Sequence, residues 1–119
     1  MKAVILFAHG ARDPRWAAPV YAIAEVMRQR DATAAVACAF LEFIEPALPQ
    51  AVDALVAAGC HEIVIVPLFM AQSGHTRRDL PDLLEQLRVR HPAVQLRVAA
   101  AIGEAPAVVA AIAEYALMA

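Results

Sequence analysis

The chain has 119 residues, a length that suits one compact domain with a substantial core. A formal net charge of −2 at pH 7 indicates neither a nucleic-acid surface nor a polybasic membrane patch. Although 61% of the residues are hydrophobic, many are alanines, and no window holds the bulky apolar run of a membrane span. The two cysteines match no disulfide or metal-ligand spacing, and no signal-peptide pattern is present. We therefore expect a cytoplasmic protein in which residues 1–119 form a single domain, with neither nucleic-acid nor membrane partners.

The first half of the chain alternates between strand and helix patterns. The apolar segment 3–8 predicts a first strand. A helix follows, from a proline in its first turn to about residue 29, because apolar residues recur at helical spacing. Residues 33–41 predict a second strand. A second amphipathic helix follows Pro46 and ends at Gly59.

The third strand, at 63–68, leads into a loop at 72–78 and then a third helix. Thr76 and Asp79 have the spacing of a capping box, but a helix starting there would place Pro81 deep enough to clash with a carbonyl. We therefore predict that Asp79 caps the third helix. This start would leave the residues before it on a loop.

A fourth strand is predicted at 94–100, and a last helix begins at Pro106. Its predicted buried side consists of Val109, Ile112, Ala113 and Leu117. Four alternations of strand and helix with short connections are typical of an α/β fold. We expect a four-stranded parallel sheet of order 2-1-3-4 with helices on both faces, as in flavodoxin-like proteins.

The predicted sheet sorts the four histidines between its two edges. His9 and His75 follow strands and should lie at the carboxyl edge, where such folds bind ligands, whereas His61 and His91 precede strands. Glu42 follows the second strand and should lie near His9. Two imidazoles and a carboxylate suit Co²⁺, Fe²⁺, Ni²⁺ or Zn²⁺. Spacing alone leaves two alternatives open, a turn-forming role for His9 and simple solvation of Glu42.

Other residues at the same edge suit a large anionic ligand. Helix N-termini converge there, and arginines and an apolar wall flank the mouth. The arginines are Arg12, Arg15, Arg77 and Arg78, and the wall is Leu68, Phe69 and Met70. A flat, polycarboxylated molecule would use both features.

Several common nucleotide motifs are missing. The chain contains no P-loop, and the loop HGARDPRW lacks both the glycine fingerprint of dinucleotide sites and the Ser/Thr-rich phosphate loop of flavodoxins. ATP, NAD and FMN are therefore disfavoured as cofactors. A flavodoxin-like nucleotide-binding module therefore stays only as a lower-ranked hypothesis.

Three segments together resemble the small class II sirohydrochlorin chelatases, single-domain members of the cobalt, nickel and iron chelatase family. The segments are AHGARDPRW, FLEFIEPAL and VPLFMAQSGHTRRDLP, in the family's order and across nearly the whole chain. The resemblance implies ATP-independent insertion of a divalent metal into sirohydrochlorin, for cobalamin, sirohaem or a nickel tetrapyrrole coenzyme. It implies no cofactor beyond the substrate metal and pairing as a homodimer.

By the same resemblance, His9, Glu42 and His75 are the catalytic residues, and both histidines are metal ligands. The expected substrate-binding residues are Arg12, Phe69, Met70, Ser73, Gly74, Arg77 and Arg78. Two positions depart from the family's usual pattern, because Ala11 stands where serine is frequent and Ser73 where glycine is common. A metal or tetrapyrrole carrier with the same site but no turnover remains the alternative.

Overall fold

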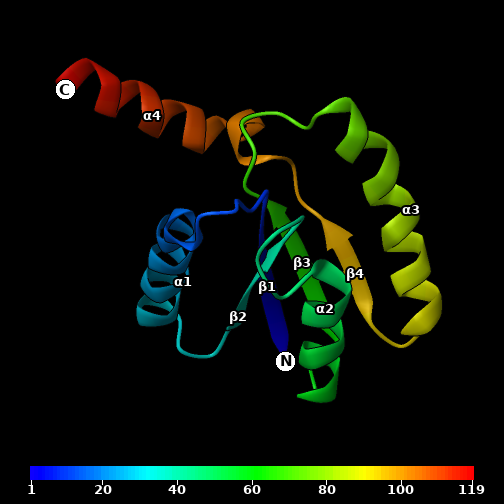
Figure 1. Cartoon of the computed structure of the whole chain (residues 1–119). Helices are drawn as coiled ribbons and strands as arrows, with labels where there is room; N and C mark the ends of the chain where they lie inside the picture. Colours follow the sequence, from blue (N-terminus) through cyan, green and yellow to red (C-terminus); the bar gives the residue numbers. More distant parts are fainter.

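The computed structural model describes the backbone of all 119 residues and every side chain except that of His75. Its centre is a parallel sheet of order β2-β1-β3-β4, which confirms the predicted topology (Figure 1). The strands are β1 (Lys2–Ala8), β2 (Ala35–Phe40), β3 (Glu62–Pro67) and β4 (Gln95–Val98). The α-helices are α1 (Ala18–Arg30), α2 (Leu48–Ala57), α3 (Gly74–Arg90) and α4 (Pro106–Met118), and two short 3-10 helices are η1 (Pro14–Ala17) and η2 (Ile102–Glu104).

Helices cover the two faces of the sheet unequally. One face packs against α2 and α3 in a core that includes Ile5, Ile63 and Ile65, all with no exposed surface. The other face packs against α1 in a smaller cluster around Leu6 and Phe40. Because the strands are buried from both sides, they read as continuous apolar runs without alternation.

Each edge strand of the sheet receives an arginine from the helix that precedes it. Arg28 of α1 donates to the carbonyl of Val36 in β2 at 2.9 Å. Arg88 of α3 donates to the carbonyl of Leu96 in β4 at 3.0 Å. These bonds occupy edge carbonyls that could otherwise pair with another strand.

The third helix starts earlier than predicted. Ser73, not Asp79, is the N-cap: its hydroxyl accepts a hydrogen bond from the Thr76 N–H at 3.2 Å, and the Thr76 hydroxyl donates to the Ser73 carbonyl at 3.1 Å. Pro81 is therefore inside α3. A proline inside a helix costs about 3 kcal/mol, which favoured a later start, but the cap at Ser73 starts the helix before Pro81.

The predicted buried side of α4 is also wrong. No residue of α4 is buried, and Val109 and Leu117 are 49% and 89% exposed. The periodicity correctly predicted a helix, but it could not show where that helix lies. None of the described helices is both long and apolar enough to cross a membrane.

Candidate functional site

His9 and Glu42 meet at the carboxyl edge of the sheet because β1 and β2 run side by side in parallel. Their pairing continues past the strand ends, with Leu41 N–H donating to the Ala8 carbonyl at 2.9 Å and Glu42 N–H to the His9 carbonyl at 3.1 Å. The side chains follow, and His9 Nδ1 lies 3.7 Å from Glu42 Oε1. The structure thus brings together two of the three predicted catalytic residues.

Gly10 allows this close approach. Its φ of +88° is in the left-handed region, and a β-carbon there would lie 2.0 Å from the Glu42 carbonyl oxygen. A residue with a side chain would push the two loops apart. The β2–α2 loop is itself tightly turned, since Ile44 N–H donates to the Glu42 carbonyl at 2.9 Å and Phe43 has a φ of 68°.

Phe69 supports the His9 ring from the side of β3. The Phe69 ring meets that of His9 edge-on at a centroid distance of 6.3 Å. It also meets the buried Phe7 ring at 5.8 Å. The orientation of an exposed imidazole is therefore connected to the core through two aromatic contacts.

His75 belongs by its backbone to the first turn of α3, and its side chain lies outside the described residues. Ser73 and Gly74 form the start of that helix, beside the ends of β1 and β3. Thr76 was missed by sequence reasoning, which treated it only as a possible cap. It is 6% exposed and lines the hollow below His9.

The predicted arginines are not equally available to a ligand. Arg12 stacks over the Phe43 ring at 5.1 Å, next to the Glu42 loop. Arg78 turns back to the Gly74 carbonyl at 3.2 Å. Arg15 binds Asp13 at 2.7 Å, and this contact lowers the pKa of the Asp13 carboxyl below its usual value. Arg77 is exposed.

The site is an open mouth above two small hollows. One, of about 70 Å³, is lined by His9, Leu41, Phe69, Ala71, Ser73 and Thr76. The other, of about 110 Å³, extends below it and shares Leu41 and Thr76. The side chains of His9 and Glu42 are 66% and 50% exposed. A large ligand would therefore lie across this mouth and not inside an enclosed cavity.

The donors at this mouth fit a divalent metal in part. Among the described side chains, no group of three or more His, Cys, Asp and Glu residues could hold a metal. The pair of His9 and Glu42 offers a nitrogen and an oxygen 3.7 Å apart. Metal bonds to such atoms are about 2.0–2.2 Å long, so both can reach one ion without moving.

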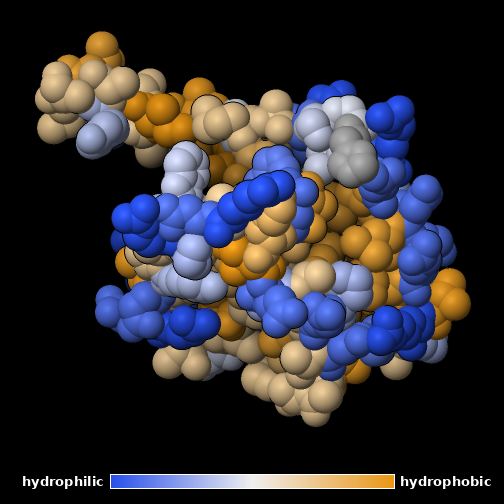
Figure 2. All heavy atoms as spheres, viewed as in Figure 1, coloured by the Kyte–Doolittle hydropathy of each residue, from blue (hydrophilic) through white to orange (hydrophobic). Residues whose placement is uncertain are grey.

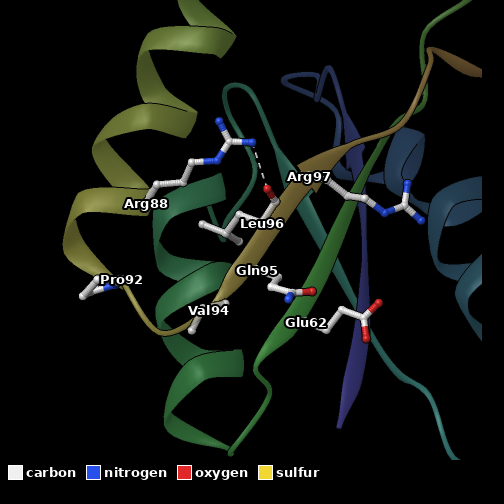
Figure 3. A pocket seen from close by; sticks show the side chains of 7 residues that line it. All are labelled: Glu62, Arg88, Pro92, Val94, Gln95, Leu96 and Arg97. Carbon is white, nitrogen blue, oxygen red and sulfur yellow. Dashed lines mark hydrogen bonds between the residues drawn. The ribbon is translucent and has the colours of Figure 1, made fainter.

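A larger hollow, of about 490 Å³, lies elsewhere, along the outer side of β4 (Figure 3). Its lining residues are Glu62, Arg88, Pro92, Val94, Gln95, Leu96 and Arg97. It contains no histidine and faces away from the carboxyl edge. Its chemistry gives no reason to place metal binding there, despite its size.

Comparison with known proteins identifies the family. The chain belongs to the CbiX family, whose model matches residues 3–117. The sirohydrochlorin cobaltochelatase of Methanococcus aeolicus is 37% identical over 84 residues, which are 71% of this chain and 59% of that protein. That of Methanopyrus kandleri is 38% identical over 84 residues, again 71% of this chain and 59% of the relative. The match thus spans less than two thirds of these relatives.

Solved structures share the fold. A CbiX protein from Marinobacter aquaeolei VT8, assigned to cobalamin biosynthesis, superposes with a TM-score of 0.83 at 33% identity, covering 99% of this chain and 96% of that one. The sirohydrochlorin chelatase SirB from Bacillus subtilis, in complex with cobalt, gives a TM-score of 0.79 at 25% identity. That comparison covers 95% of this chain but 48% of SirB.

Proposed function

We propose that this protein inserts a divalent metal into sirohydrochlorin without ATP, with Co²⁺ as the first candidate and Fe²⁺ and Ni²⁺ as alternatives. The observation that carries the proposal is the His9–Glu42 pair, 3.7 Å apart at the carboxyl edge of the sheet. Relatives at 37% and 38% identity are named as sirohydrochlorin cobaltochelatases, which supports the choice of substrate. In this proposal residues 1–119 act as one chelatase domain.

Metal insertion requires two pyrrole N–H protons to leave as one divalent ion enters the macrocycle, so charge is conserved. A neutral His9 would hold the ion through Nδ1, the nitrogen nearest Glu42. The Glu42 carboxylate would balance the charge of the ion and accept a proton. We assign His75 as the second imidazole from its position in the first turn of α3. The histidine that does not hold the ion would then accept the second proton.

The substrate would lie across the open mouth. Phe69 and the exposed Met70 would contact its apolar ring. Arg12, Arg77 and Arg78 would bind its carboxylates, and Ser73 and Gly74 would lie against its edge at the start of α3. Because Arg12 already lies beside the Glu42 loop, we assign it the carboxylate nearest the metal.

We also propose a homodimer that works in the cytoplasm and uses no cofactor beyond the substrate metal. Cys38 and Cys60 are both free thiols, as is usual in a reducing compartment. The side chains of His9 and Glu42 are 66% and 50% exposed at the mouth, where a second copy would provide a further wall.

The test is multiple-turnover insertion of Co²⁺ into sirohydrochlorin, followed by the absorption change, with the tetrapyrrole in large excess over protein. His9→Ala and Glu42→Gln should each lower the initial rate by roughly a hundredfold or more. His61→Ala is the matched control, because His61 is an exposed histidine at the opposite edge of the sheet. A carrier would stop at one metallated product per protein chain. That result would reject the enzyme, whereas an unchanged rate in His9→Ala would reject the role assigned to His9.

A further inference from the structure

The last helix, α4, is apolar on every side, and none of its residues is buried against the described part of the chain. Glu114 is its one charged residue. Figure 1 shows α4 projecting away from the sheet, and among the described elements its main contact is with η2 at its base. Figure 2 shows this arm mostly in the hydrophobic colours. A helix with this composition is normally buried.

α4 is also too short to be stable in water without packing against another surface. It has 13 residues, and isolated helices of that length are marginal in water because tertiary packing supplies most helix stability. The helix contains neither lysine nor arginine, so it lacks the basic face of a helix that lies on a membrane surface. A protein surface is therefore a better partner for α4 than a membrane.

The sheet is open over β4 on the α1 side, where Glu62, Gln95 and Arg97 are exposed. α1 packs mainly against β1 and β2, with Val66 of β3 at the margin of its cluster, and Figure 1 shows no helix over β4 on that face. Val64 pairs with Val4 on one side and with Arg97 on the other, so these side chains share the face. In Figure 3, Glu62, Gln95 and Arg97 point away from α3, on this open side. Parallel sheets normally have helices on both faces.

One flank of α1 forms an apolar wall for this area. Arg28 reaches the outer strand β2 from one flank of the helix. At 100° per residue, Ile23 and Val26 lie on the opposite flank, toward β3. These two residues are 43% and 45% exposed. Together with the half-buried Val66 and with Val64, which is 7% exposed, they define the surface beside α1 that we call the α1–β3 groove.

The base of α4 packs tightly against the loop that follows β3. Gly103 of η2 donates its N–H to the Phe69 carbonyl at 3.1 Å, and a β-carbon on Gly103 would lie 1.8 Å from the Met70 carbonyl oxygen. Ala105 N–H then donates to the Ile102 carbonyl at 3.2 Å. This tightly packed turn directs α4 outward from the same edge as the site.

We infer that α4 of one copy packs into the α1–β3 groove of a second copy, and that the second copy does the same in return. Such an exchange has two-fold symmetry and closes on itself. Charge agrees with it: Glu114 is the single acid of α4, and Arg97 borders the groove without an ion-pair partner among the described side chains. The inference deepens the homodimer in the proposed function. η2, at the base of α4, binds the loop of Phe69 and Met70. The exchange of α4 would therefore place the second copy beside the mouth.

Light scattering after gel filtration tests the interface directly. The unchanged chain should be a dimer at micromolar concentration. Ile112→Glu in α4 and Ile23→Glu in the groove should each weaken dimerisation by roughly tenfold or more while circular dichroism shows a folded monomer. Val89→Glu is the matched control, because Val89 is 74% exposed on α3, away from the groove, and should leave the dimer intact.

A mixing experiment separates exchange from folding back. In a Cys38→Ala background, Ile112→Cys and Val26→Cys chains are mixed and treated with a short bis-maleimide linker. Covalent dimers between the two variants are expected. A linked monomer from a chain that carries both changes at high dilution would overturn the inference, as would a monomeric parent or a dimer unaffected by Ile112→Glu. A dimer that inserts no metal would instead reject the proposed function and leave the interface standing.

Discussion

Gly10 packs so closely on Glu42 that a β-carbon there would lie 2.0 Å from the Glu42 carbonyl oxygen. This contact and the N–H donated by Glu42 to the His9 carbonyl hold the two loops of the site together. The geometry of the His9–Glu42 pair is therefore fixed by the main chain.

Gly10→Ala should consequently destabilise the fold more than the same change at Gly59. Both glycines have a left-handed φ, +88° and +95°, but a β-carbon on Gly59 meets nothing within 4 Å. Backbone strain alone costs about 1 kcal/mol, and the clash at Gly10 should add roughly 1–3 kcal/mol. Urea unfolding followed by circular dichroism measures both. Equal losses would show that the loops can separate without cost.

His9 and Glu42 should act as a unit in binding metal. His9→Ala and Glu42→Gln should each weaken Co²⁺ binding by roughly tenfold or more, and the double variant should lose less than the sum of the two. The coupling energy should be at least about 1 kcal/mol. Titration calorimetry measures it. The control pair is His61→Ala with Glu62→Gln, neighbours at the opposite edge, for which no effect is expected. Additive losses would mean that the two side chains do not share an ion.

Phe69→Leu should lower the rate of metal insertion by roughly tenfold, because it frees the His9 ring from its edge-on support. Stability should fall only modestly, since Phe69 is half-buried. The control is Tyr21→Leu, which removes a similar edge-on contact of 6.0 Å with Phe40, away from the site. Steady-state kinetics of metal insertion, measured for both variants, test this difference. An equal loss of rate in Tyr21→Leu would show that the effect of Phe69→Leu comes from general destabilisation and not from the His9 contact.

The sequence predicted the sheet well because buried parallel strands leave continuous apolar runs. These runs show where each strand lies and at which edge of the sheet each loop lies. Because His9 and Glu42 follow neighbouring parallel strands, the sequence also predicted that they lie close together. It failed where local hydrogen bonds decide, since Ser73 caps α3 through Thr76 at a point where a downstream proline suggested a loop. It failed again at α4, because periodicity describes a helix face but not the surface that covers it.

Stability should depend on pH through Asp31, which closes the turn between α1 and β2. Hydrogen bonds from the Thr33 hydroxyl and N–H, at 2.6 and 3.0 Å, lower the pKa of the Asp31 carboxyl. A lowered folded-state pKa adds stability above the usual value near 4, and this stability is lost as pH falls through the folded value. The advantage of the unchanged chain over Asp31→Asn should therefore shrink as pH falls below about 4. Unfolding in urea at several pH values measures this, and a constant difference would contradict it.

Asp53 should contribute to stability by joining α2 to the end of α3. Its carboxylate pairs with Arg90 and lies 2.7 Å from His91 Nε2, in a contact where the two side chains are 33% and 17% exposed. Asp53→Asn removes the charge and leaves a mostly buried imidazole with a weaker partner, at a cost of about 1–2 kcal/mol. Urea unfolding at pH 7 measures this. Asp82→Asn, on an exposed position of α3, should stay within about 0.5 kcal/mol of the unchanged chain. Similar values for the two variants would show that the Asp53 contact is only a surface pair.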